Sequence, residues 1–369
     1  MQDYILLSKD TRIANIIEGK LEPVLPDRLP LLLQRTGDYL AWLESRAIDR
    51  SRVNSRLLKK ALRLGKKDDI NTVLAVNAAT ITDNFWVKPI DDTETTYADI
   101  RFTMNRFDNL ALTGDVNAFD QPPSRTPELT NTGSFEKCWR LVDGQWWMAK
   151  AGRPEELYSE LLSYHLGKLL KLPIAEYRAN GAFILSRDFT DGAKVDFEPA
   201  AALIGDESDY LKIYEALKPF GEAVTHPYMR MCSFDALVLN MDRHEHNFGV
   251  LRDSETGAVL SLAPLFDHNI ALVSRGYPRN ITAVGDRLIQ DFAELLQHVG
   301  KPIALPKLSR GKIERCMNKI PWELPQTDDV TAPRQFVVEY LSNRQKELGA
   351  RCKDLLILRV PQRERELER

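Results

Sequence analysis

The sequence predicts an α+β protein, and two kinds of pattern lead to this fold class. Residues 138–142 and 145–150 are apolar and aromatic runs on either side of Asp143-Gly144, which predicts a β-hairpin. Residues 157–170 and 289–299 place apolar side chains at helical spacing, which predicts amphipathic helices. Strand-like runs are concentrated before residue 198, and helical patterns dominate after it.

Length and composition describe an ordinary globular chain. Its 369 residues, 43% of them hydrophobic, are enough for two or three packed units. A net charge of −3, from 50 basic and 53 acidic residues, produces no global field for nucleic acid or an anionic membrane. The start lacks the basic flank and apolar run of a secretory signal, and no segment reaches the roughly eighteen apolar residues of a membrane span. We therefore expect a cytoplasmic protein with no membrane partner.

The four cysteines are scattered, with no C-x-x-C spacing that would indicate zinc or a redox pair. We expect Cys138, Cys232, Cys316 and Cys352 to be buried free thiols.

Residues 1–92 are predicted to form a mixed, mostly helical accessory domain. Residues 31–43 and 53–64 have helical periodicity, and neither contains a catalytic pattern. Part of this region is locally basic, and Asp49 is its only acidic residue. The basic residues are Arg46, Arg50, Arg52, Arg56, Lys59, Lys60, Arg63, Lys66 and Lys67. Such runs are usually solvated helix faces, and the alternative is a contact with nucleic acid or a protein partner.

Residues 93–198 are predicted to form a small lobe built on antiparallel strands. The expected elements, in order, are strand-like runs at 97–102 and 110–112, a turn-rich stretch at 120–125, the hairpin at 138–150, a helix at 157–170, and strands at 176–178 and 182–186. Hairpin, helix and further strands follow one another in this way in the small lobe of kinases.

Residues 199–369 are predicted to form a larger helical lobe. Helices are expected at 208–217, 229–239, 289–299, 309–320 and 333–358, and a hairpin pairs 248–251 with 259–262. Pro333 suits the first turn of its helix. The charged end at 362–369 is expected to be frayed.

Three side chains around this hairpin match the needs of phosphoryl transfer from ATP. Transfer requires a carboxylate that orients the attacking hydroxyl, an amide oxygen on Mg²⁺, and a second carboxylate that bridges the metal to the phosphates. Asp242, Asn247 and Asp267 supply these groups in this order. Asp242 follows an apolar helix, and Asn247 precedes a strand whose partner leads to Asp267, so the two oxygen ligands can meet on one hard cation. The alternative is a solvated turn with an Asx cap.

Histidines and an arginine surround these groups. We expect Arg243 and His244 to brace the loop by hydrogen bonds to backbone or to Asp267. His246 and His268 suggest zinc as an alternative, but no cysteine and no H-x-x-x-H spacing supports it.

A kinase also needs a cation for the ATP phosphates and a carboxylate that holds this cation. Lys150 ends an aromatic strand, and Glu160 lies on the margin of the apolar stripe of the next helix, with Glu156 as the alternative. Upstream, Thr132, Gly133 and Ser134 form a small loop whose backbone N–H groups can face an anion, although an ordinary turn has the same composition. The chain has no G-x-x-x-x-G-K-[ST] motif of P-loop NTPases.

Together these residues resemble the HipA-like serine/threonine kinases, including the CtkA-type proteins. The similar segments are 132–137, 148–150, 159–160 with the helix leading to Leu172-Pro173, 185–189, 240–248 and 265–267. The resemblance implies a two-lobed protein-kinase-like fold in which Asp242 is the base, Asn247 and Asp267 bind Mg²⁺, and Lys150 holds ATP phosphates.

The resemblance extends to other residues and to partners. It places Phe197 and Glu198 in a segment that connects the lobes and meets adenine, and we assign His244 to the same nucleotide site. Family members can phosphorylate their own phosphate loop, for which Thr130, Thr132 and Ser134 are the candidates here. An antitoxin-like protein is a partner that the family suggests. Two features depart from the family: residues 1–92 do not obviously match its N-terminal subdomain, and Ser134-Phe135 replaces smaller or polar residues.

The function predicted from the sequence is therefore that of an ATP- and Mg²⁺-dependent serine/threonine protein kinase capable of autophosphorylation. The order D-R-H-x-x-N also occurs in phosphatidylinositol 3/4-kinases, so a lipid or small-molecule kinase is the enzymatic alternative. A regulatory protein that contacts nucleic acid or a partner through its N-terminal region is the non-enzymatic alternative. The sequence does not identify the protein substrate.

Overall fold

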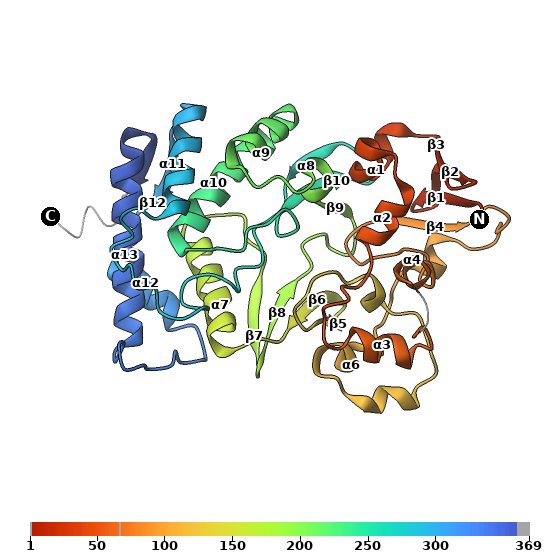
Figure 1. The fold of residues 1–369 in the computed structure, drawn as a ribbon, viewed down its shortest axis with the longest axis horizontal. Helices are drawn as coiled ribbons and strands as arrows, with labels where there is room; N and C mark the ends of the chain where they lie inside the picture. The colour runs from red at the N-terminus through yellow and green to blue at the C-terminus, as the bar shows by residue number, and fades with distance from the viewer. Residues whose placement is uncertain (1, 66–67, 360–369) are drawn as a thin grey trace. The chain divides into compact units, whose positions relative to one another are not determined.

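The computed structural model describes residues 2–65 and 68–359 and confirms the α+β class (Figure 1). Two compact units are present, and both are discontinuous in the chain. Unit 1 comprises Met1–Gly152, Asn180–Gly205 and Gly249–Ser261, and unit 2 comprises Arg153–Ala179, Asp206–Phe248 and Leu262–Arg369. The division of the chain after residues 92 and 198 stays a prediction.

Unit 1 begins with an antiparallel sheet that the sequence analysis missed. Its order is β3-β2-β1-β4, with β1 at Tyr4–Ser8, β2 at Thr11–Ile17, β3 at Lys20–Pro23 and β4 at Phe85–Pro89. On β1, Ile5 and Leu7 enter one hydrophobic cluster and Leu6 enters another. Because both faces are buried, the strand has no polar alternation that would distinguish it from a helix. The prediction of a mostly helical N-terminal region was therefore wrong in this part.

The helices of unit 1 are shorter than their periodicity predicts. The pattern at residues 31–43 is split into α1 (Leu31–Thr36) and α2 (Tyr39–Ser45) by Gly37, which has φ +68°. Asp38 then caps α2 by accepting the N–H of Ala41 at 2.9 Å. The other helices of this part of the chain are α3 (Ser55–Ala61), α4 (Asp69–Leu74), α5 (Tyr97–Ile100) and α6 (Asp108–Thr113).

The strand-like runs predicted at 97–102 and 110–112 are wrong, because α5 and α6 occupy these positions. A capping box explains α5: the carboxylate of Asp99 accepts from both the N–H and the hydroxyl of Thr96, at 2.9 and 2.6 Å. Short 3-10 turns complete this region at Pro26–Arg28, Val116–Asp120 and Pro127–Thr130.

The predicted hairpin is confirmed as β5 (Lys137–Val142) and β6 (Gln145–Lys150). Asp143 and Gly144 both have positive φ, 51° and 74°, as a tight hairpin turn requires. The sheet order is β5-β6-β8-β7, with β8 at Phe183–Arg187 and β7 at Tyr177–Asn180, the strand in which the chain passes from unit 2 into unit 1. In this register Lys137 lies opposite Lys150.

A third sheet, in the order β11-β10-β9, contains the second predicted hairpin. Its strands are β9 (Val195–Pro199), β10 (Gly249–Asp253) and β11 (Val259–Leu262), and the short helix α8 (Ala201–Ile204) follows β9. Gly249 is required here, since a Cβ at this position would overlap the carbonyl oxygen of Glu198.

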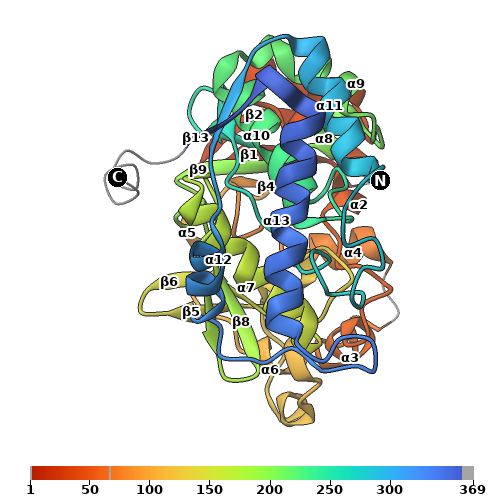
Figure 2. The ribbon, with the colours of Figure 1, turned by 90° about the vertical axis from the view of Figure 1, so that its left-hand side faces the viewer.

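Unit 2 is mainly helical, as predicted. Its helices are α7 (Pro154–Leu169), α9 (Tyr210–Leu217), α10 (Glu222–Val238), α11 (Arg287–Val299), α12 (Arg310–Met317) and α13 (Pro333–Cys352). Helices α10, α11 and α13 pack together, and Figure 2 shows α13 along its length beside α11. Fully buried Arg344 of α13 joins the three, because it donates to Ala236 O at 2.8 Å and to both carboxylate oxygens of Asp286 at 2.8 Å.

The last predicted helix, 333–358, is too long. Helix α13 ends at Cys352, and β13 (Leu356–Arg359) pairs in parallel with β12 (Ile303–Pro306). All four cysteines are buried and free, as predicted. No described helix is both long and apolar enough to cross a membrane. The predicted frayed end at 362–369 lies outside the described residues.

Asp196 on β9 is a buried carboxylate that ties this strand to the segment before β4. It accepts the N–H of Asn84 at 2.8 Å and the Nδ2–H of Asn84 at 2.6 Å, and its exposure is 2%. Burial, reinforced by the nearby charge of Asp83, raises the pKa of Asp196 to about 7. The folded unit therefore holds a proton that the unfolded chain releases near the usual pKa of 3.8.

We predict that this contribution to stability is complete below about pH 4 and is lost as the pH rises to about 7, by roughly 2 to 4 kcal/mol. Asp196→Asn should remove it, so that the urea midpoint falls less between pH 5 and pH 8 than in the wild type. Asp191→Asn, an exposed carboxylate of the same unit, is the control and should keep the wild-type fall. An equal fall in Asp196→Asn and wild type would contradict the assignment.

Candidate active site

The Asp242 loop begins where α10 ends. Leu239 takes the left-handed conformation, with φ +51°, and its N–H donates to Asp235 O, which terminates the helix. Asp242 is half-buried three residues later. Burial raises the pKa of Asp242 and the charge of Asp267 adds to this rise, while His244 and Arg243 oppose it.

Asn247 closes the loop through its own amide group. Its Nδ2–H donates to Asp242 O at 2.7 Å, and its backbone N–H donates to His244 O at 2.8 Å. Asn247 is 6% exposed, so these bonds hold it in one orientation. With the amide nitrogen on Asp242 O, the Oδ1 atom is the one that can serve a cation.

Arg243 connects the two segments that carry the predicted metal ligands. Its Nη1 donates to the carbonyl oxygens of Asn247 and of Phe266, the latter at 2.7 Å. Its Nε and Nη2 bind the carboxylate of Asp235 at 2.8 and 3.1 Å. The side chains of Arg243 and Asp235 are 3% and 0% exposed. The prediction that Arg243 braces the loop through backbone is confirmed.

Asp267 lies in a strained backbone conformation. Its φ is +60°, which few residues other than glycine adopt, and its N–H donates to the hydroxyl of Tyr177 at 3.1 Å. Just before it, Leu265 N donates to Pro173 O at 2.8 Å and Ala175 N to Leu265 O at 2.9 Å. These bonds enforce the strain, and enforced strain of this kind is concentrated at functional sites.

Asp235 and Tyr177 are site residues that the sequence analysis missed. A signal for Asp235 was present, because a single aspartate interrupts the apolar run from Phe234 to Leu239 and a buried carboxylate needs a partner. No local pattern marks Tyr177, whose bond to Asp267 spans ninety residues.

His268 belongs to the Arg243 network. Its Nε2 lies 3.0 Å from Arg243 Nη2 and 3.7 Å from the Asp235 carboxylate. Among the described residues, no group of three or more His, Cys, Asp or Glu side chains could hold a metal ion, which gives the zinc alternative no support. His244 is exposed, and its Nδ1 accepts the N–H of His246 at 3.2 Å.

Lys150 and Glu160 are both buried, at 9% and 1% exposure, at the end of β6 and within α7. Glu156, the alternative to Glu160, is engaged at the start of α7: it accepts the N–H of Arg153 at 2.9 Å and pairs with its guanidinium at 3.1 Å. Glu156 is therefore committed to the start of its own helix, and Glu160 stays the predicted partner of Lys150. Because Lys150 lies in unit 1 and Glu160 in unit 2, their pairing stays a prediction.

The three candidate hydroxyls of the phosphate loop differ in exposure. Thr130 is buried and donates to Ala79 O at 2.6 Å, whereas Thr132 and Ser134 are exposed. Gly133 has φ +100°, a backbone conformation that favours glycine.

Glu198 has a structural role within unit 1. Its carboxylate pairs with buried Arg252 and accepts the N–H of Leu31 at 2.7 Å, and burial raises its pKa. Phe197 lies beside it on β9, where its N–H donates to Thr82 O at 2.9 Å and its ring meets the ring of Phe189 edge-on. Any contact of this segment with adenine stays a prediction.

The basic stretch is solvated in part, as expected: Arg50, Arg56, Lys60 and Arg63 are exposed, whereas Arg46 and Arg52 are not. Arg46 is buried and pairs with Asp83 at 2.8 Å, and the side chain of Arg52 is fully buried. Lys59 pairs with Asp69 at 3.0 Å. Lys66 and Lys67 lie outside the described residues.

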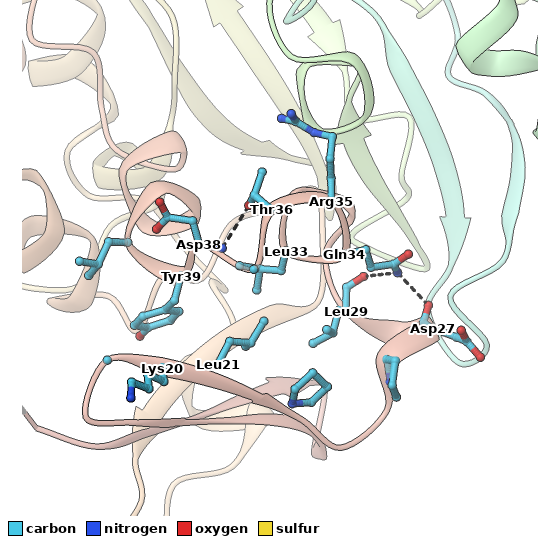
Figure 3. Close-up of a pocket in the computed structure, with 15 residues that line it drawn as sticks. Lys20, Leu21, Asp27, Leu29, Leu33, Gln34, Arg35, Thr36, Asp38 and Tyr39 are labelled. Carbon is cyan, nitrogen blue, oxygen red and sulfur yellow. Dashed lines mark hydrogen bonds between the residues drawn. The ribbon is translucent and has the colours of Figure 1, made fainter.

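A separate pocket of ≈ 670 Å³ lies in unit 1 between the β2–β3 hairpin and helices α1 and α2. Figure 3 shows Leu21, Leu29 and Leu33 between these elements, and Gln34 donates to Leu29 O at 2.8 Å. None of its lining residues is a predicted site residue.

No protein-family model and no curated protein matches the chain. Among solved structures it is similar to the toxin HipA of Shewanella oneidensis MR-1, solved with HipB and its operator DNA. The TM-score is 0.54 at 11% identity, over 94% of this chain and 97% of that chain. It is also similar to the Helicobacter pylori proinflammatory kinase CtkA, with a TM-score of 0.44 at 16% identity, over 63% of this chain and 95% of that chain.

The comparison with HipA confirms the resemblance to HipA-like proteins at the level of the fold. Because the alignment with HipA spans 94% of this chain, most of residues 1–92 lie within it. The expectation that this region departs from the family was therefore wrong for the fold.

We predict that Asp235→Ala lowers the free energy of unfolding of unit 2 by about 3 to 5 kcal/mol, because it leaves the Arg243 guanidinium buried without its partner. Urea unfolding measures this loss. Glu222→Ala is the control on the same helix, since Glu222 pairs with Lys301 at the surface, and it should change the midpoint little. Equal effects of the two substitutions would show that the Asp235–Arg243 pair is not a main support.

Proposed function

We propose that the chain is an ATP- and Mg²⁺-dependent kinase of the HipA-like type that phosphorylates serine or threonine hydroxyls. The observation that carries this proposal is the Arg243 bridge, which binds the carbonyl oxygens of Asn247 and Phe266. One buried guanidinium thus fixes the loop that carries Asp242 and Asn247 to the residue before Asp267. The fold shared with HipA supports the same reading.

The residues available for the metal fit Mg²⁺ in their chemistry. Asn247 offers its Oδ1 atom and Asp267 its carboxylate, and Mg²⁺ prefers such oxygen ligands. The metal, when bound, would neutralise charge on the ATP phosphates. The N–H bond to Tyr177 holds the left-handed backbone of Asp267, from which its carboxylate would reach the metal.

Asp242 is the base in this proposal. Its carboxylate would accept the hydrogen bond of the attacking hydroxyl, align it with the γ-phosphate and take its proton. Partial burial raises the pKa of Asp242, which makes its carboxylate a better proton acceptor. The Asn247 side chain bonded to Asp242 O limits the movement of the loop during this step.

Unit 1 would supply the nucleotide contacts. Lys150 would bind the α- and β-phosphates and be oriented by Glu160, and the N–H groups around Thr132, Gly133 and Ser134 would cover the phosphates. We assign unit 1 to the small lobe and unit 2 to the large lobe of a kinase. Phe197 and Glu198 would connect the lobes beside adenine, and His244 would complete the nucleotide site.

The alternative functions agree with these observations to different degrees. Arg46 and Arg52 are buried in ion pairs and are not available to nucleic acid, whereas Arg50, Arg56, Lys60 and Arg63 stay exposed for such a contact. A lipid or small-molecule kinase would use the same Asp242, Asn247 and Asp267 chemistry, and the protein substrate has no assigned surface. An antitoxin-like partner is proposed from the likeness to HipA, which was solved with HipB.

We predict that Asp242→Asn lowers phosphoryl transfer from radiolabelled ATP by more than about 100-fold, because the variant keeps the shape of the side chain and loses the base. Glu245→Gln, in the same loop, is the matched control and should keep most of the activity. Full activity of Asp242→Asn, with the control also active, would refute the assignment of the base.

We also predict self-labelling on Thr132 or Ser134 and none on Thr130, since only the first two hydroxyls are exposed. Phosphopeptide mapping after incubation with ATP and Mg²⁺ identifies the residue, with Asp242→Asn as the inactive control. Phosphate on Thr130, or its absence from the whole loop in an active preparation, would contradict this prediction.

A further inference from the structure

Arg52 spans the two ends of the loop at residues 132–136. Its Nη1 donates to Asn131 O at 3.4 Å, and its Nη2 donates to Lys137 O. The side chain is 0% exposed. A single guanidinium therefore holds the residue before the loop and the residue after it.

The carboxylate of Glu128 also connects the two ends of the loop. Its Oε2 accepts from Asn131 Nδ2 at 2.9 Å and pairs with Arg52 at 3.4 Å, while its Oε1 accepts the N–H of Trp139 at 2.7 Å. Asn131 precedes the loop and Trp139 lies on β5 beyond it. The buried pair of Arg52 and Glu128 thus closes the base of the loop from both sides.

Asn54 holds the loop itself. Its Nδ2 donates to Glu136 Oε2 at 2.5 Å and its backbone N–H donates to Glu136 Oε1 at 3.3 Å. Glu136 O in turn accepts the N–H of Ala151 at 2.9 Å, and Lys137 lies opposite Lys150 in the hairpin. The segment before α3 is therefore joined by hydrogen bonds to the end of the loop nearest Lys150.

We propose that Arg52, Asn54 and Glu128 are positioning residues for nucleotide binding. They hold the ends of the 132–136 loop so that its N–H groups are arranged before a phosphate arrives, which lowers the entropy lost on binding. The N-terminal ninety residues, which carry no catalytic pattern, would in this way set the affinity for ATP. This inference rests on the proposed function, in which the loop binds phosphates.

The test uses the full chain with two substitutions and one control. Arg52→Lys keeps the charge but loses the planar fork that reaches both carbonyl oxygens, and Asn54→Ala removes the side-chain bond to Glu136. Arg50→Lys is the matched control, because Arg50 is 73% exposed and pairs with Asp69 at the surface. Calorimetry measures the Kd for Mg²⁺ with a non-hydrolysable ATP analogue, and steady-state kinetics give KM and kcat.

Arg52→Lys and Asn54→Ala should each raise the Kd for the analogue and the KM for ATP by about tenfold. The kcat at saturating ATP should stay within about twofold, and Arg50→Lys should match the wild type. Amide hydrogen exchange should become faster at residues 132–136 and stay unchanged elsewhere in unit 1.

An unchanged Kd in both variants would overturn the proposal, as would a loss of kcat or of global stability without a change in Kd. Wild-type protein that binds the analogue but transfers no phosphate would refute the proposed function alone, since the comparison of Kd values still decides this inference. Wild-type protein that does not bind the analogue would overturn both.

Discussion

The buried ion pair between Arg243 and Asp235 is the interaction on which the candidate site depends. Asp235 lies in the last turn of α10, so a buried helix fixes the guanidinium. The same guanidinium binds the carbonyl oxygen of Asn247, just before β10, and that of Phe266, just before Asp267. Contacts to carbonyl oxygens depend little on side-chain identity, so Arg243 can set the path of two loops while leaving their functional side chains to face a ligand.

A buried ion pair also holds a loop in unit 1. Arg52 and Glu128 form a buried pair that binds backbone on both sides of residues 132–136, and Arg243, paired with Asp235, likewise binds the carbonyl oxygens of Asn247 and Phe266. A buried charge needs several hydrogen bonds to offset its desolvation, and loop carbonyl groups need donors. A buried guanidinium meets both needs, because its several N–H groups donate to the loop carbonyl oxygens. This explains why arginine rather than lysine occupies both positions.

Sequence patterns predicted the local parts of this molecule well. The hairpin at Asp143-Gly144, the helices of unit 2, and the backbone role of Arg243 each follow from nearby residues. The first sheet was missed because both faces of β1 are buried, and α5 was taken for a strand because the capping box of Thr96 and Asp99 received no weight. Tyr177 and Arg52 act through contacts distant in sequence, so no motif of neighbouring residues marks their roles.

The central claim is that Asn247 and Asp267 form a Mg²⁺ site for a bound nucleotide. Calorimetric titration of ATP into the wild type and Asp267→Asn, each with Mg²⁺ and with EDTA, tests it most directly. Mg²⁺ should strengthen ATP binding to the wild type, and Asp267→Asn should lose most of this gain. Equal affinity of the wild type with and without Mg²⁺, or an undiminished gain in Asp267→Asn, would contradict it.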